Sequence, residues 1–590
     1  MNIKHLIILL FCAFIGSAHA QKIQYKLRMD APQTHYFQVE MELTDFDDEE
    51  LKIKMPVWAP GSYLVREFSK NVDLVVALDK KGDKLPVEKS SKNTWVIKKG
   101  KEKKVIVKYE VYAFELSVRT SFLDLTHGYV SGSGVFMYLE GHKAVKGCLD
   151  VIPHTSFSKI TTALPFCKES IASDGGTRFK FNDYDQLVDC PIEIGNQEIF
   201  DFTAAGVEHT VAIYGRGNHN IENMKRDMAK IIESATGVFG QNPNKDYTFI
   251  IHNVEQGQGG LEHCNSTTLS VNRWTYTGSD YLGFLNLVAH EYFHLWNVKR
   301  IRPIELGPFN YDQENYTTLL WVMEGFTSYY DELLMLRAGF YAKEQYLGKL
   351  NSSLNYVEGS IGSRVQPLAH SSYDAWIKAY RPNENSYNTT MSYYSRGQVM
   401  AAQFDAMIVK VSNGEKCLDH FMQSIYKTYH VDQNRGFTEA EFKAELEKFT
   451  ESDLTEFFER FIHGTEIPDY EKVFSQVGLK ANRQDVKEVR FGTRLGGTTV
   501  RGVDRGSAAE SIGLSVGDEV IAIDNYRIDG GSYGEMLSKF GLNDTFELLI
   551  SRDNILYTLK GKMSEITTPL FMLELDTDFA NKKLTNYWLR

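Results

Sequence analysis

The sequence lacks the surplus of basic residues that proteins use to bind nucleic acid. Its 590 residues include 65 Lys and Arg against 77 Asp and Glu, which gives a formal net charge of -12. A chain with this balance offers no strongly positive surface to a polyanion. We therefore expect no nucleic-acid partner.

The sequence also contains few cysteines. It has six, none of them spaced as C-x-x-C, so they do not predict a cysteine-bound metal. Apart from Cys12 near the N-terminus, five remain, and an odd number leaves at least one unpaired. Two alternatives stay open for the others: a disulfide among Cys148, Cys167 and Cys190, or buried free thiols.

Long apolar runs are absent as well. The chain begins with a charged start, an apolar run over residues 6–15 and an Ala-x-Ala end at residues 18–20. About ten apolar residues are too few to cross ~30 Å of hydrocarbon, so we expect no membrane span. The pattern instead predicts a secretory signal peptide at residues 1–20, cleaved before Gln21. We expect an exported protein, periplasmic or secreted.

The rest of the sequence changes its periodicity along the chain and contains no internal repeat. Alternating apolar residues such as Phe37, Val39 and Met41 predict a β-rich N-terminal domain at residues 21–217. After residue 218 the helical period dominates. It predicts a strand at residues 247–253, helices at 224–239, 281–300 and 317–337, the last closed by Gly339, and further helices to about residue 478.

Short strands return in the C-terminal part, from about Ala481 to Met563. The run Gly-Leu-Ser-Val-Gly-Asp-Glu-Val-Ile at residues 513–521 resembles the point in a PDZ domain where a short helix leads into a central strand. Ser507-Ala508-Ala509 fits the same pattern. We expect a PDZ-like domain at residues 481–563, which implies a peptide or protein ligand, and a C-terminal tail at residues 564–590.

A metal-binding motif lies within the helix expected at residues 281–300. The segment His290-Glu291-Tyr292-Phe293-His294 places two histidines four residues apart, so both imidazoles lie on one helical face. Two ligands of one zinc ion need this spacing. Glu291 lies one step around the helix, where it can reach a metal-bound water without being a ligand. The motif predicts His290 and His294 as zinc ligands and Glu291 as general base.

A catalytic zinc also needs a third protein ligand and an open position for water. Glu324 is the best candidate, because a carboxylate in the apolar helix at residues 317–337 is costly unless it is paired or binds a metal. A solvent-facing glutamate is the alternative. Asp331 follows two turns later on the same face, where it can accept the outer N–H of a zinc-bound histidine.

Three further loops contain suggestive residues. Glu262 follows a glycine-rich and closely approachable backbone at residues 257–260, and Tyr393 and Tyr394 precede a helix, where a hydroxyl can stabilise an oxyanion. Taken alone, the first pattern is more typical of a plain loop and the second of a core aromatic pair. The Trp-Ala-Pro-Gly-Ser-Tyr loop at residues 58–63 fits either packing or the rim of a binding cleft.

In chain order, these motifs resemble those of the gluzincin aminopeptidases: a Gly-Gly-Leu-Glu-His loop, H-E-x-x-H, Glu-Gly-Phe-Thr and Tyr-Ser-Arg-Gly. The β-rich N-terminal domain, the loop at residues 58–63 and the PDZ-like domain resemble the glycyl aminopeptidase family within that clan. This resemblance covers nearly all of the chain. It implies a multidomain α+β architecture, with a thermolysin-like zinc catalytic domain at residues 218–338 and an α-helical domain at residues 339–478.

The resemblance also implies a role for individual residues. It assigns one Zn2+ per chain to His290, His294 and Glu324, the general base to Glu291, substrate binding to Gly259, Gly260 and Glu262, and the oxyanion donor to Tyr394, with Tyr393 as an adjacent alternative. Glu262 matches the carboxylate that binds the free amino group of the substrate. Two departures from the pattern are His263 in place of an asparagine, which leaves amine recognition open, and the 29 residues between His294 and Glu324.

We therefore expect a zinc aminopeptidase that acts on peptides with a free N-terminus, and the resemblance implies a preference for glycine or alanine. Two alternatives remain. A thermolysin-like endopeptidase would share the zinc residues but need no amine-binding Glu262. A non-catalytic PDZ scaffold would contain a degenerate protease domain, which the complete set of ligands and Glu291 argues against.

Overall fold

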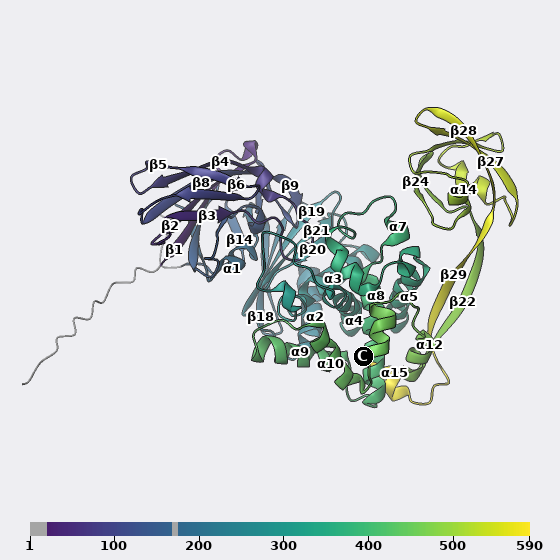
Figure 1. Cartoon of the computed structure of the whole chain (residues 1–590). Coiled ribbons are helices and arrows are strands. Elements are labelled where there is room, and N and C mark those ends of the chain that lie inside the picture. Colours follow the sequence, from purple (N-terminus) through teal and green to yellow (C-terminus); the bar gives the residue numbers. More distant parts are fainter. Residues whose placement is uncertain (1–20, 168–174) are drawn as a thin grey trace, which may run out of the picture.

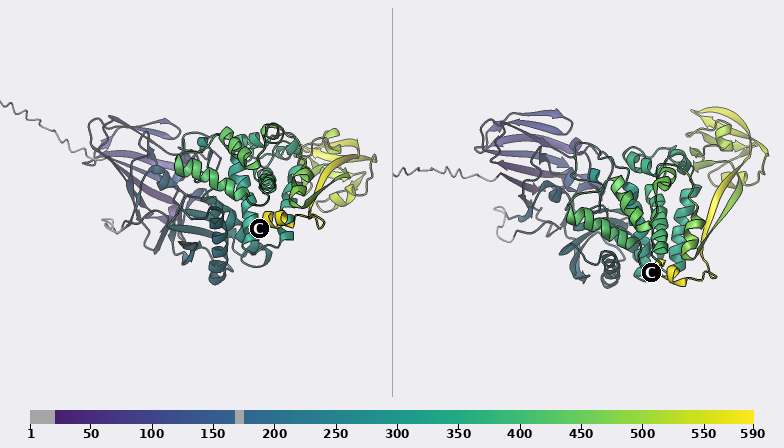
Figure 2. Two further views of the ribbon diagram at one scale, coloured as in Figure 1. Left: turned by 90° about the horizontal axis from the view of Figure 1, so that it is seen from below. Right: turned by 60° about the horizontal axis from the view of Figure 1, so that its bottom comes forward.

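The computed structural model describes residues 21–167 and 175–590. The expected signal peptide lies outside the described residues. The molecule is elongated, with a β-rich domain at one end, a mixed body in the middle and a small β unit at the other end (Figure 1), and two further views keep this order (Figure 2). Within the described ranges, no helix has the length and apolarity needed to span a bilayer.

Three sheets form the N-terminal domain. The first has the strand order β15 (Thr177–Phe181), β13 (Gly147–Ile152), β1 (Lys22–Arg28), β2 (Tyr36–Thr44), β8 (Lys104–Tyr112), β4 (Val72–Asp79), β5 (Lys84–Leu85). The second is β14 (Lys159–Thr162), β16 (Ile192–Gly195), β11 (Gly128–Val130), β10 (Thr120–Leu123), β9 (Phe114–Ser117). The third is β12 (Tyr138–Leu139), β3 (Glu50–Lys54), β7 (Thr94–Lys98), β6 (Val87–Ser91), and a short helix α1 (Tyr184–Val188) precedes β16. As expected, the alternating residues Phe37, Val39 and Met41 face a shared apolar core.

A five-stranded sheet begins the body, which we define as residues 198–478. Its order is β17 (Glu198–Ala204), β18 (Val207–Tyr214), β19 (Asp246–Val254), β21 (Ser266–Asn272), β20 (Gln258–Glu262), so β20 is an edge strand. Strands β17 and β18 lie before residue 217, but β18 pairs with β19 and β17 pairs with β18, so the sheet of the body starts earlier than the expected boundary. Strand periodicity does not reveal which sheet a strand joins.

Helices α2 (Ile221–Phe239), α3 (Gly278–Phe293) and α4 (Phe326–Arg337) match the three expected helices of the body. Helix α3 ends before residue 300 because the chain turns, with Val298 at a φ of 90°. The start of the third helix is a π-helical turn at Trp321–Gly325, and Gly339 takes the left-handed conformation after α4, with φ 79°.

The helical part of the body continues the same core rather than starting a separate one. Its helices are α5 (Lys343–Gly359), α6 (Leu368–Tyr373), α7 (Ser386–Thr389), α8 (Tyr393–Val411), α9 (Leu418–Ile425), α10 (Glu439–Thr450), α11 (Thr455–Phe457) and α12 (Tyr470–Phe474). One hydrophobic cluster contains residues of the sheet, of α2 to α4 and of α5, α6, α8, α9, α10 and α12. The ranges expected as two domains, 218–338 and 339–478, therefore pack as one unit.

The C-terminal unit, residues 491–563, is joined to the body by a long antiparallel ribbon of β22 (Leu479–Arg490) and β29 (Ser564–Leu575). Its elements are β23 (Thr493–Gly496), β24 (Thr499–Val503), α13 (Ala508–Ser511), β25 (Glu519–Ile523), β26 (Tyr526–Arg527), α14 (Ser532–Leu537), β27 (Thr545–Arg552) and β28 (Ile555–Lys562). A short helix leads into the central strand β25, as the sequence predicts. The unit has its own small apolar core.

Residues 564–590 form part of the fold rather than a loose tail. After β29, helix α15 (Lys582–Trp588) returns to the body, where the side chains of Leu584 and Trp588 join the main hydrophobic cluster. Asn351 and Asn355 of α5 each exchange hydrogen bonds with the backbone of β29 at distances of 2.7 to 3.3 Å. These bonds fasten the part of the ribbon around Phe571 and Leu573 to the body.

The structure distinguishes between a disulfide and free thiols for four of the cysteines. Cys148, Cys190, Cys264 and Cys417 are free thiols, so no disulfide joins Cys148 to Cys190. Cys190 and Cys417 are buried, Cys148 is half-buried and Cys264 is exposed. For these four residues the free-thiol alternative holds.

We predict that two deletions at the C-terminus have different effects on stability. Replacing residues 491–563 by a short glycine-serine linker should leave the body folded, because Arg490 and Ser564 are paired across the ribbon. Truncation after Gly478 also removes Trp588, whose side chain is fully buried, and loss of such a side chain costs about 3–5 kcal/mol. Thermal unfolding of both variants tests this. Equal stability of the two would contradict the packing role of α15.

Candidate metal centre

The two histidines of the H-E-x-x-H motif face the carboxylate of Glu324, as the sequence predicts. Nε2 of His290 lies 3.5 Å and Nε2 of His294 lies 3.3 Å from Oε2 of Glu324. Two ligands of a tetrahedral ion with bonds of about 2.0–2.1 Å are separated by about 3.4 Å, so the spacing fits a shared metal. Helix α3 supplies the imidazole of His290, its C-cap residue supplies that of His294, and the π-helical turn before α4 supplies Glu324.

The outer nitrogens of both imidazoles are held in place. Nδ1 of His290 donates to Oδ2 of Asp331 at 2.8 Å, which is the contact expected from the sequence, and Asn286 donates to the other oxygen at 3.2 Å. Nδ1 of His294 donates to the backbone oxygen of Asn297 at 2.9 Å. Each bond fixes the tautomer that leaves Nε2 directed at Glu324, as is usual around bound metals.

The charge distribution of this cluster favours an added cation. Burial opposes a charge on His290, but Asp331 and Glu324 raise the pKa of its imidazole well above the usual value. Burial likewise raises the pKa of Glu324, yet His294 and His290 together lower it to about 2. The carboxylates thus draw positive charge onto the imidazoles. A bound metal ion would provide that charge instead.

Glu291 lies beside the candidate metal ligands, and one of its carboxylate oxygens is available to accept a proton. It is 5% exposed, and its Oε2 has no hydrogen-bond partner among the described residues. Burial raises the pKa of Glu291 to about 7, although the nearby imidazoles oppose the shift. A Cβ at Gly260 would lie 2.3 Å from Cδ of Glu291, so the glycine lets β20 approach the base closely.

A cavity of about 580 Å³ opens at this cluster. Its lining includes Gly259, Gly260, Glu262, His290, Glu291, His294, Glu324, Asp331 and Tyr394, so the structure brings together the residues that the sequence singled out for chemistry, apart from the alternative donor Tyr393. Tyr394 stacks on His290 with ring centroids 6.2 Å apart, whereas Tyr393 stacks on Tyr394 at 4.8 Å and lines only a neighbouring cavity that Tyr394 also lines. The geometry therefore favours Tyr394 over Tyr393 as the hydroxyl nearest the cluster.

Glu262 lies at the end of β20 in the same cavity. It is 4% exposed, and its Oε1 finds no hydrogen-bond partner within the described chain. A buried carboxylate oxygen without a partner is costly, which points to a ligand that supplies the missing positive group.

His263 takes no part in this cavity. Its Nδ1 contacts Oδ1 of Asp189 at 3.1 Å, and the same carboxylate accepts hydrogen bonds from Lys299 at 2.7 Å and from the backbone N–H of Cys264 at 2.8 Å. Asp189 follows α1 in the N-terminal domain. The histidine that departs from the family pattern therefore anchors the end of β20 to that domain.

Two residues of the N-terminal domain, Gly61 and Arg119, line the cavity although no sequence pattern predicted a role for them there. Nη2 of Arg119 donates to the backbone oxygen of Gly260 at 3.3 Å. Neither residue belongs to a motif with a metal or acid-base signature. Only the loop at residues 58–63, expected as either packing or a cleft rim, pointed to Gly61.

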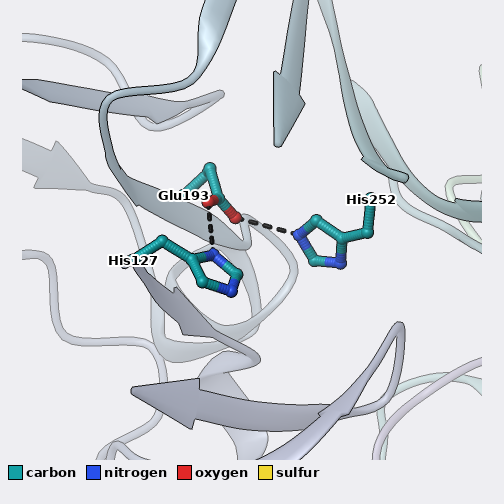
Figure 3. Close-up of side chains that lie close together, drawn as sticks. All are labelled: His127, Glu193 and His252. Carbon is teal, nitrogen blue, oxygen red and sulfur yellow. Dashed lines mark hydrogen bonds and ion pairs between the residues drawn. The ribbon is translucent and has the colours of Figure 1, made fainter. Parts of the chain in front are cut away.

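A second group of His and Glu side chains lies between β16 and β19 (Figure 3). Glu193 accepts a hydrogen bond from Nδ1 of His127 at 2.7 Å and another from Nε2 of His252 at 2.9 Å. These are hydrogen-bond distances and are shorter than the spacing between two metal ligands. The other ring nitrogens have no partner in the described part of the chain, unlike those of His290 and His294. We interpret this group as a buried triad that joins the two domains.

Comparisons with known proteins agree with this division of the chain. Residues 24–196 match the family model of the peptidase M61 N-terminal domain, and residues 283–400 match that of M61 glycyl aminopeptidase. No curated protein sequence matched the chain.

Among solved structures, an aminopeptidase N family protein from Idiomarina loihiensis is 29% identical, with a TM-score of 0.88 over 96% of this chain and 100% of that one. An M1 zinc metallopeptidase from Deinococcus radiodurans is 14% identical, with a TM-score of 0.50 over 76% of this chain and 95% of that one, a likeness of fold alone. The chain thus contains regions that match both M61 peptidase family models, with a β-rich N-terminal domain followed by a largely helical part, and the matches support a peptidase.

Proposed function

We propose that this protein is an exported zinc aminopeptidase that removes N-terminal residues from peptides. The observation that carries the proposal is the cavity that holds the three candidate metal ligands together with one oxygen of Glu291 and one of Glu262, neither of which has a hydrogen-bond partner among the described residues. Metal ligands and a base alone would suit many hydrolases. Glu262 adds a fixed negative charge where the amino end of a substrate would lie.

His290, His294 and Glu324 would hold the zinc ion, since two imidazole nitrogens and one carboxylate oxygen are a common ligand set for catalytic zinc. The cavity beside them leaves room for a fourth ligand. When bound, zinc would polarise the scissile carbonyl and lower the pKa of water. Asp331 and Asn297 hold the imidazoles in the orientation that this ligand set requires.

Glu291 and Tyr394 then act on the substrate. Glu291 takes a proton from the attacking water and returns it to the leaving amine, for which its buried Oε2, without a hydrogen-bond partner in the described part of the chain, is suited. The Tyr394 hydroxyl donates a hydrogen bond to the oxygen that gains negative charge during attack. Both side chains line the same cavity as the metal ligands.

Glu262 distinguishes this proposal from the thermolysin-like endopeptidase. Its carboxylate would pair with the free ammonium group of the substrate and so set which peptide bond meets Glu291. A preference for N-terminal glycine or alanine is part of the proposal and is supported by the match to the M61 glycyl aminopeptidase model. Export rests on the signal-peptide pattern at residues 1–20.

We predict about one zinc per chain, and three variants separate binding from chemistry. His290→Ala and Glu324→Ala should lose the metal, because each removes a ligand, while Glu291→Gln should keep it and still be inactive. Metal analysis by mass spectrometry and turnover of an unblocked glycyl substrate test this. A Glu324→Ala variant that retained both metal and turnover would exclude Glu324 as a ligand.

Asp331→Asn should weaken zinc binding without abolishing it. Loss of an outer partner of a zinc-bound histidine typically reduces metal affinity by about 10–100-fold, and this asparagine keeps the size of the side chain. Competition with a chelator measures the change. Asp280→Asn is the matched control, because Asp280 is exposed and lines the same cavity. Equal zinc affinity in the two variants would remove Asp331 from the metal centre.

Glu262→Ala should cripple cleavage of free glycyl or alanyl substrates and leave the zinc content unchanged. Removing one partner of a buried charge pair costs about 3–5 kcal/mol, which corresponds to roughly two to four orders of magnitude in kcat/KM. Acetylating the substrate amine should abolish the reaction of the wild type. If the wild type cleaves the acetylated peptide internally and Glu262→Ala behaves alike, the endopeptidase alternative replaces this proposal.

A further inference from the structure

The loop at residues 58–63 leaves the N-terminal domain and packs into the core of the body. Trp58 and Tyr63 are 0% and 1% exposed and belong to the hydrophobic cluster of the body. Both rings contact the indole of Trp376, at centroid distances of 5.1 and 5.7 Å. The two aromatic side chains therefore fix both ends of the loop.

Hydrogen bonds hold the backbone between these ends. Nε1 of Trp58 donates to the backbone oxygen of Asn310 at 2.8 Å, and the N–H of Ser62 donates to the oxygen of Ala59 at 3.0 Å. The hydroxyl of Tyr380, in the helical part of the body, donates to the oxygen of Gly61 at 3.4 Å. A loop held in this way has a defined position rather than a range of them.

At the tip of the loop, Gly61 lies directly against the amine-binding candidate Glu262. Gly61 has a φ of +86°, which favours glycine. A Cβ at this position would lie 2.5 Å from Oε1 and 2.8 Å from Oε2 of Glu262, and 2.8 Å from Cδ1 of Leu261. These distances leave no space for one additional carbon atom at Gly61. Gly61 itself lines the cavity.

We propose that Gly61 is a specificity-determining residue that closes the cavity at Glu262 and restricts substrates to peptides with an unsubstituted N-terminal amine. An ammonium group needs only to reach the carboxylate. A preceding residue, or even a methyl group on the amine, would need the space that the 58–63 loop fills. This inference rests on the proposed aminopeptidase function and adds the feature that ends the substrate-binding cavity.

Gly61→Ala should displace the Glu262 carboxylate and so weaken binding of the free amine. A misplacement of about 1 Å can cost on the order of a hundredfold in rate, and we expect a loss of that order in kcat/KM, mainly through KM, with zinc retained. Gly141→Ala is the matched control: Gly141 has a φ of +76° in the same domain, and no described atom would lie within 4 Å of its Cβ. The control should match wild type.

Combining substitutions at Gly61 and Glu262 distinguishes a contact with the carboxylate from simple backbone strain. In a Glu262→Ala background, the added methyl group no longer meets a carboxylate, so Gly61→Ala should cause little further loss. If the two losses add, Gly61 acts through the backbone and the proposal is wrong.

A substrate-side measurement keeps the test independent of whether Gly61→Ala folds. An N-methylglycyl substrate keeps the positive charge of the glycyl substrate and adds one carbon at the amine. Wild type should hydrolyse it about a hundredfold more slowly. Equal rates would overturn the role of Gly61 while leaving the aminopeptidase intact. No hydrolysis of the unblocked glycyl substrate by zinc-loaded wild type would instead defeat the proposed function.

Discussion

The buried carboxylate of Glu324 between two imidazoles constrains how the rest of the body packs. A carboxylate that is 2% exposed needs compensating groups, and His290 and His294 provide them only if two separate helices meet closely. Helix α8 must approach as well. A Cβ at Gly325 would lie 2.4 Å from the Cα of Gly397, so glycine at both positions lets the two backbones touch and brings Tyr394 to the cavity.

The N-terminal domain contributes to the site as well as covering it. Arg119 bonds to the backbone of β20, Asp189 anchors the following turn through His263, and Tyr129 donates to Thr268 of β21 at 2.9 Å. The triad around Glu193, fully buried, ties the same two domains together. Strand β20 carries Glu262 and lies at the edge of its sheet, so these contacts replace the support that a neighbouring strand would give.

The residues of the metal centre could be predicted from the sequence, because their spacing within helices determines which side chains share a face. The spacing of His290 and His294, the apolar setting of Glu324 and the i+7 position of Asp331 each follow from helix periodicity, and the structure brings these side chains together.

Contacts between segments far apart in the chain could not be predicted from the sequence. The β-rich pattern over residues 21–217 does not indicate that its last two strands, β17 and β18, belong to the sheet of the body. Periodicity likewise gives no sign that α15 returns to the core. The N-terminal residues beside Glu262 were missed for the same reason, because Gly61 and Arg119 acquire their places only through tertiary packing.

The proposed function requires one metal ion, held by His290, His294 and Glu324 rather than by the group of His127, Glu193 and His252. X-ray diffraction from crystals of the wild-type protein, recorded on both sides of the zinc absorption edge, locates zinc directly. We expect one anomalous peak, bounded by Nε2 of His290, Nε2 of His294 and the carboxylate of Glu324. A zinc-loaded crystal with no peak there, or with its peak among His127, Glu193 and His252, would contradict the account.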